Sequence, residues 1–74
     1  MSHKVSIVIE RDVHGFYAYA PELPGCHTQA GTIDEAVERI KEAVELYLEA
    51  LSPEERDVCL SKDILTTSVD VHVA

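Results

Sequence analysis

The stretch PELPGCHTQAGTIDEA, which spans residues 21–36, decides the fold of this chain. Two prolines and a glycine fall within its first five residues, and together they predict a rigid, irregular corner in the backbone. Leu23 is expected to place its side chain beneath that corner. The residues that we take as the structural signature are Pro21, Leu23, Pro24, Gly25, Cys26, Thr32 and Glu35.

A short strand and a long helix are predicted after the corner. Residues 26–29 have the length of a third strand. Thr32 and Glu35 then form a T-x-x-E capping box, in which each side chain is expected to accept a hydrogen bond from the other residue's amide. Apolar residues recur at steps of three and four from Ile33 to Leu51, which predicts one amphipathic helix over that range.

A β-hairpin is predicted before the corner. Val5, Ile7 and Ile9 alternate with polar residues, as in a half-buried strand. Residues 11–15 resemble a hairpin connection that ends in a glycine, where a positive φ is available. Residues 16–20 form the second predicted strand, which Pro21 ends because proline has no amide hydrogen to donate.

A short helix and a last strand are predicted at the end of the sequence. Ser52 and Pro53 have the pattern of a helix start, and that helix would continue to about Leu60. The last strand is indicated by three alternating valines, Val69, Val71 and Val73. The fold class is therefore α+β with the order β-β-β-α-β, in one domain over residues 1–74, with one long helix on a face of the sheet.

The small size and acidic charge of the chain limit its partners. A domain of 74 residues has a small core, so we expect a homodimer or larger oligomer. The net charge of −8, with only six scattered Lys and Arg residues, argues against direct binding of nucleic acid. Acidic surfaces favour encounters with basic macromolecules, although such a charge also serves solubility alone.

The cysteines and the hydropathy indicate a soluble, cytoplasmic protein. Cys26 and Cys59 form neither a CxxC pair nor a disulfide framework, so both thiols are expected to be reduced. The sequence has no run of apolar residues that approaches membrane-spanning length and no signal-peptide pattern.

The corner and helix resemble the HicB family of type II toxin–antitoxin systems. The resemblance covers roughly residues 3–50, and its order and spacing are more specific than any single element. It rests on these segments: Gly15-Phe16-Tyr17, Pro21 to Cys26, Thr28-Gln29, Thr32 to Ala36 and the helix as far as Leu48.

This resemblance implies a partial RNase H-like fold, in which a three-stranded antiparallel sheet gains a fourth strand beside the first. It also implies a partner, a small basic HicA-type toxin that cleaves mRNA and whose active site the antitoxin blocks. Many family members carry a C-terminal DNA-binding segment. About twenty residues follow the long helix here, so we expect no such module.

Catalytic and metal-binding roles find little support in the sequence. An RNase H-like nuclease needs converging carboxylates that hold two divalent metals, and the first strand offers no central aspartate to join Asp70. Cys26 and His27 are adjacent on a strand and point to opposite faces. The four histidines lack metal-ligand spacing. We therefore predict no enzyme, no metal and no cofactor.

Two surfaces are candidates for binding a partner. Tyr17 and Tyr19 share the outer face of the second strand, where aromatic residues either anchor an interface or pack against the sheet or a second copy. The exposed helix face is acidic, and it is either solvated, directed at a toxin or part of an oligomer contact. The candidate partner-binding residues are Tyr17, Tyr19, Glu38, Glu42 and Glu49.

The function predicted from the sequence is therefore that of a HicB-like antitoxin domain, which binds and occludes a small basic toxin. The alternative is an oligomeric scaffold that has no toxin and binds another protein or a small ligand.

Overall fold

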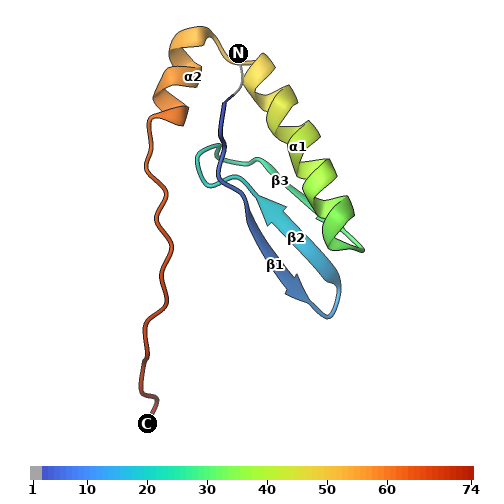
Figure 1. Cartoon of the computed structure of the whole chain (residues 1–74), viewed down its shortest axis with the longest axis vertical. Helices are drawn as coiled ribbons and strands as arrows, with labels where there is room; N and C mark the ends of the chain where they lie inside the picture. Colours follow the sequence, from blue (N-terminus) through green and yellow to red (C-terminus); the bar gives the residue numbers. More distant parts are fainter. Residues whose placement is uncertain (1–2) are drawn as a thin grey trace.

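Three antiparallel strands followed by two helices make up the fold (Figure 1), which a computed structural model describes over residues 3–74. The strands lie in the order β1-β2-β3, so β1 is an edge strand. The α+β class is confirmed. The elements are β1 (Val8–Asp12), β2 (Gly15–Tyr19), β3 (His27–Ala30), α1 (Ile33–Glu49) and α2 (Pro53–Leu60).

The register of the sheet separates an inner from an outer face. Ile9 pairs with Ala18, and Ala18 pairs with Thr28, so these three side chains share the inner face, where Ala18 is fully buried. Side chains alternate along a strand, which places Tyr17 and Tyr19 on the outer face. The helix α1 contacts β2 and β3, and its buried residues Ala36, Ile40 and Val44 complete the core.

The corner, residues 20–26, consists of two consecutive β-turns. Leu23 donates its amide to the Ala20 carbonyl at 3.0 Å, and Cys26 donates to the Leu23 carbonyl at 3.0 Å. In the second turn Pro24 precedes Gly25, which has a φ of 81°. Proline followed by a residue of positive φ is the signature of a type II turn, so the two residues select this geometry. Leu23 lies beneath the corner with 1% of its surface exposed, as predicted.

The start of α1 is capped on one side only. Thr32 accepts the Glu35 amide at 3.2 Å, as the sequence predicts. The reciprocal bond is absent, and the prediction of a full capping box is wrong here: the Glu35 carboxylate instead pairs with the Arg39 guanidinium at 3.1 Å. Arg39 also donates to the Gln29 carbonyl at 2.8 Å, so this one side chain connects the first turns of α1 to β3.

The second helix has the complete capping box. Ser52 accepts the Glu55 amide at 3.2 Å and donates its own amide to the Glu55 carboxylate at 2.9 Å. These bonds to Ser52 hold the pKa of Glu55 below its usual value, because they favour the charged form. Arg56 donates to the Leu48 carbonyl at 2.8 Å, which attaches α2 to the end of α1.

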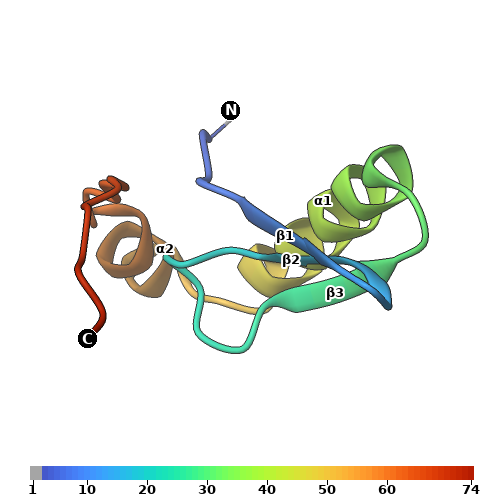
Figure 2. The same cartoon turned by 90° about the horizontal axis from the view of Figure 1, so that it is seen from below.

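The predicted fourth strand is not formed, and this part of the predicted fold is corrected. Residues 62–74, which we call the tail, have no strand or helix and leave the body of the molecule after α2. Figures 1 and 2 both show the tail apart from β1 and from α1. A strand exists only through bonds to a neighbouring strand, so an alternating pattern alone cannot produce one.

Strand boundaries also differ from those predicted. The first strand begins at Val8 rather than near Val5 and continues to Asp12, so its turn contains only Val13 and His14. Gly15 has the expected positive φ, at 123°. The third strand starts one residue late, and α1 ends at Glu49 rather than Leu51. Within residues 3–74, no helix is long and apolar enough to cross a membrane.

Candidate functional site

The outer face of the sheet carries a group of rings, Tyr17, Tyr19 and His27, which we call the aromatic patch. The Tyr17 ring lies 5.7 Å from that of Tyr19 and 5.6 Å from that of His27, measured between centroids. Cross-strand register produces the cluster, because Tyr19 pairs with His27. Both tyrosines are half-buried and His27 is exposed. Rigid aromatic surface of this kind suits an interface with another protein.

The exposed side of α1 carries a second surface, the acidic ridge. Its members recur at steps of four, three and four residues, so at about 100° per residue they fall on one narrow stripe. This stripe lies opposite the buried residues of the same helix. All its members are exposed: Glu38, Glu42, Glu45 and Glu49.

These two surfaces face opposite sides of the molecule. The aromatic patch lies on the face of the sheet that points away from α1, while the ridge lies on the side of α1 that points away from the sheet. The five candidate partner-binding residues are therefore not brought together into one site. A compact partner that covers one surface leaves the other free.

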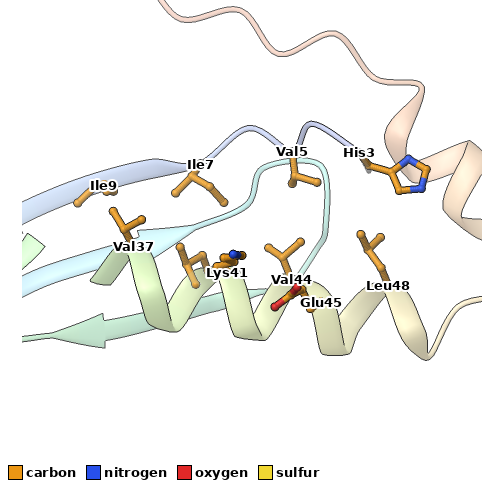
Figure 3. Close-up of a pocket in the computed structure, with 10 residues that line it drawn as sticks. His3, Val5, Ile7, Ile9, Val37, Lys41, Val44, Glu45 and Leu48 are labelled. Carbon is orange, nitrogen blue, oxygen red and sulfur yellow. The ribbon is translucent and has the colours of Figure 1, made fainter. Parts of the chain in front are cut away.

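A third feature is a groove between α1 and the free edge of the sheet, which we call the edge groove. It has a volume of about 600 Å³, and Lys41 and Glu45 lie at its rim. Figure 3 shows side chains of the N-terminal segment facing those of α1 across it. Its aliphatic lining comprises Val5, Ile7, Ile9, Val37, Ile40, Val44 and Leu48.

A buried carboxylate holds one wall of the edge groove in place. The Ser6 amide donates to Oε1 of Glu22 at 2.8 Å, and Glu22 is 4% exposed. Extending the β1–β2 register by two residues would place Ser6 opposite Pro21, which has no amide hydrogen. Glu22 therefore supplies the contact by which the corner holds the segment that precedes β1.

Removing this carboxylate is expected to destabilise the protein. Glu22→Ala should lower the free energy of unfolding by about 2 kcal/mol, because a charge-assisted hydrogen bond is lost and the Ser6 amide is left unpaired. Glu22→Gln keeps an acceptor oxygen and should lose about half as much. Urea unfolding measures both, with exposed Glu10→Ala as the control. Equal stability of the Glu22→Ala and Glu10→Ala variants would contradict the proposed role.

Cys26 behaves as a small apolar residue of the corner. It is buried, and burial raises the pKa of its thiol because the thiolate would lose its hydration. This environment disfavours a nucleophilic role. Asp70 lies on the exposed tail and does not converge with the carboxylates of α1. Over residues 3–74, no group of three or more His, Cys, Asp or Glu side chains is placed to hold a metal.

Two residues that shape these features, His27 and Glu22, are not among those predicted from the sequence. His27 joins the aromatic patch because its strand pairs with β2, and the sequence alone did not connect it to Tyr17. Glu22 lies within the predicted corner, and a carboxylate between two turn prolines is the signal that could single it out. The apolar stripe of α1 is predicted correctly. The pattern does not show, however, that Val37 in this stripe is exposed and lines the edge groove instead of packing in the core.

Comparison with known families gives one match that covers most of the chain. Residues 5–72 match the family described as HicB_like antitoxin of bacterial toxin-antitoxin system. The match includes the corner, both helices and most of the tail.

Relatives occur in archaea and bacteria. A UPF0150 protein of Archaeoglobus fulgidus is 62% identical over 47 residues, which cover 62% of this chain and 68% of the relative. A UPF0150 protein of Helicobacter pylori is 36% identical over 70 residues, which cover 95% of this chain and 97% of the relative. No solved structure matches the chain.

Proposed function

This chain belongs to the HicB-like antitoxin family, and from that membership we propose that it is an antitoxin domain that binds and occludes a small basic HicA-type toxin, an mRNA-cleaving enzyme. The family match over residues 5–72 is the observation that carries the proposal. In this role the protein acts by binding rather than by catalysis, in the cytoplasm where mRNA is available.

Charge supports the choice of a basic partner. The acidic ridge places four carboxylates on one stripe of α1, and the whole chain has a net charge of −8. Such a field accelerates the encounter with a basic protein and weakens as salt screens it. We therefore place the first contact with the toxin on the ridge, at Glu38, Glu42 and Glu49.

The aromatic patch is the competing contact surface. Tyr17 and Tyr19 offer more apolar area than the ridge, and aromatic residues often contribute most of the affinity of an interface. Because the two surfaces face opposite sides of the molecule, a binding experiment with variants of each can distinguish them.

Charge reversal on the ridge is expected to weaken the toxin complex. With a small basic HicA-type protein as the probe, Glu38→Lys/Glu42→Lys should lower its affinity for the antitoxin by about 10- to 100-fold at low salt, chiefly through slower association. Surface plasmon resonance at two salt concentrations measures this effect. The wild-type association rate should fall as salt rises, and the rate of the variant should change less.

The control variant is Glu54→Lys/Asp57→Lys on α2. Each substitution adds two charges, so both double variants move the formal net charge from −8 to −4. If both double variants lose the same affinity for the toxin, the effect comes from the net charge of the chain and not from the position of the ridge. Unchanged binding of the ridge variant, together with loss of binding by Tyr17→Thr/Tyr19→Thr, would move the contact to the aromatic patch.

An oligomeric scaffold without a toxin is the alternative function. The edge groove favours it, because an apolar groove of about 600 Å³ can accept a protein segment or a small ligand. Co-expression with any small open reading frame that adjoins its gene separates the two functions. Growth rescue with a co-purified complex supports the antitoxin, and absence of both supports the scaffold.

A further inference from the structure

The edge groove and the tail are two unpartnered apolar surfaces of the same chain. Val69, Val71 and Val73 are 77%, 75% and 90% exposed, and they alternate with polar residues as in a strand that buries one face. Isolated apolar residues on a surface need no explanation, but an exposed alternating row in a chain that also has an open apolar groove does. Both surfaces are apolar, and each could cover the other.

The two surfaces also match in spacing. Val5, Ile7 and Ile9 line the groove at every second position, which repeats the spacing of the three tail valines. The edge of β1 that faces away from β2 carries unpaired backbone groups at alternate residues, as any edge strand does. An added strand would satisfy these groups, and its valines would cover the groove.

The path of the chain separates the tail from its own groove. The Arg56–Leu48 hydrogen bond attaches α2 to the end of α1, and the tail leaves from α2 along the side of the molecule, apart from β1 in both views (Figures 1 and 2). The radius of gyration is 14.4 Å, whereas a compact domain of this length has about 11 Å. In a single chain, the tail valines therefore do not reach the edge groove.

We propose that residues 65–73 of one copy add to the free edge of β1 in a second copy, so that the tail valines fill its edge groove, and that reciprocal exchange of tails forms a closed homodimer. Such an exchange gives a dimer with twofold symmetry and no unpaired tail, because each copy supplies one tail and accepts one. The sheet of each copy would then have four strands, the last of them from its partner. This inference does not depend on a toxin.

Crosslinking between chains of different mass tests the exchange. One tagged chain carries Ile7→Cys and one untagged chain carries Val71→Cys, both with Cys59→Ser, and a short bis-maleimide tolerates a register shift of one residue pair, about 7 Å. We expect the crosslinked product to contain one chain of each mass. If instead a chain that carries both cysteines links only to itself, the tail folds onto its own body and the proposal is wrong.

Charged substitutions in the tail supply a second, independent test. Val69→Asp/Val71→Asp should convert the dimer to a single chain of 8.2 kDa in light scattering. Ser68→Asp/His72→Asp adds the same charge on the opposite side of the tail and should leave the dimer intact. Circular dichroism should show an unchanged body in both variants, because the tail makes no part of the core. The proposal would be overturned if the wild-type protein has the mass of one chain, or if both double variants change the mass equally.

Salt separates this proposal from the toxin complex. Two copies that each carry −8 repel one another, so added salt should strengthen the homodimer. The same change should weaken a complex with a basic toxin. If the homodimer does not form, the toxin complex can still be tested, and if the toxin complex does not form, the homodimer can still be tested.

Discussion

Replacing Leu23 by alanine is expected to unfold a large share of the molecules at 37 °C. Leu23 and Ile40 are the largest side chains that are fully buried in the described residues. Leu→Ala substitutions in a core cost about 3–5 kcal/mol, from lost burial and from the cavity that remains. A chain of this length has about 4–11 kcal/mol of stability in total. Thermal and urea unfolding, followed by circular dichroism, measure the loss.

Leu46→Ala is the matched control for this substitution. Leu46 lies on α1 and is 68% exposed, so its replacement removes the same atoms from a solvated site. Its stability should change by less than about 0.5 kcal/mol, since alanine is also a good helix former. A loss of equal size in the two variants would show that the corner does not depend on Leu23.

Gly15→Ala is expected to be the most damaging of three glycine substitutions. Gly15 has a φ of 123°, and a Cβ atom there would lie 2.7 Å from the Ala30 carbonyl oxygen. The backbone strain alone costs about 1–3 kcal/mol, and relief of the clash would push β3 away from β2. We expect a total loss of about 3 kcal/mol in urea unfolding, with loss of the β1–β2 turn.

The other two glycines form a graded control series. Gly25 has a φ of 81°, but a Cβ there meets nothing within 4 Å, so Gly25→Ala should cost only the strain of about 1–2 kcal/mol. Gly31 lies outside the left-handed region and is also open, so Gly31→Ala should be close to neutral. Any other order would mean that the close approach to Ala30 is not what requires glycine at position 15.

These two predictions concern the same architectural unit. Leu23 fills the space beneath the corner, and Gly15 allows the hairpin to lie close to the end of β3. Both surfaces considered for the toxin depend on that unit, because it fixes the register that groups Tyr17 with His27 and holds α1 against the sheet. Binding measurements on the proposed contact residues therefore need variants whose core is intact.

Features that depend on only a few neighbouring residues can be predicted from the sequence. The two turns of the corner, the positive φ of Gly15, the Thr32 cap, the capping box of α2 and the long amphipathic helix all follow from local chemistry. A proline, a glycine or a cap acts on backbone that lies at most four residues away, so no distant partner is needed. The sequence also carried the family resemblance, which the match over residues 5–72 confirms.

Contacts between residues far apart in the sequence depend on the folded arrangement of the whole chain. Glu22 reaches the Ser6 amide across 16 residues of sequence, and Glu35 binds Arg39 rather than Thr32 because Arg39 is also bound to the neighbouring strand. The tail has a strand pattern but no strand, since it lies apart from the free edge of β1. Pattern determines what a segment is able to form, and the position of the rest of the chain determines whether a partner is within reach.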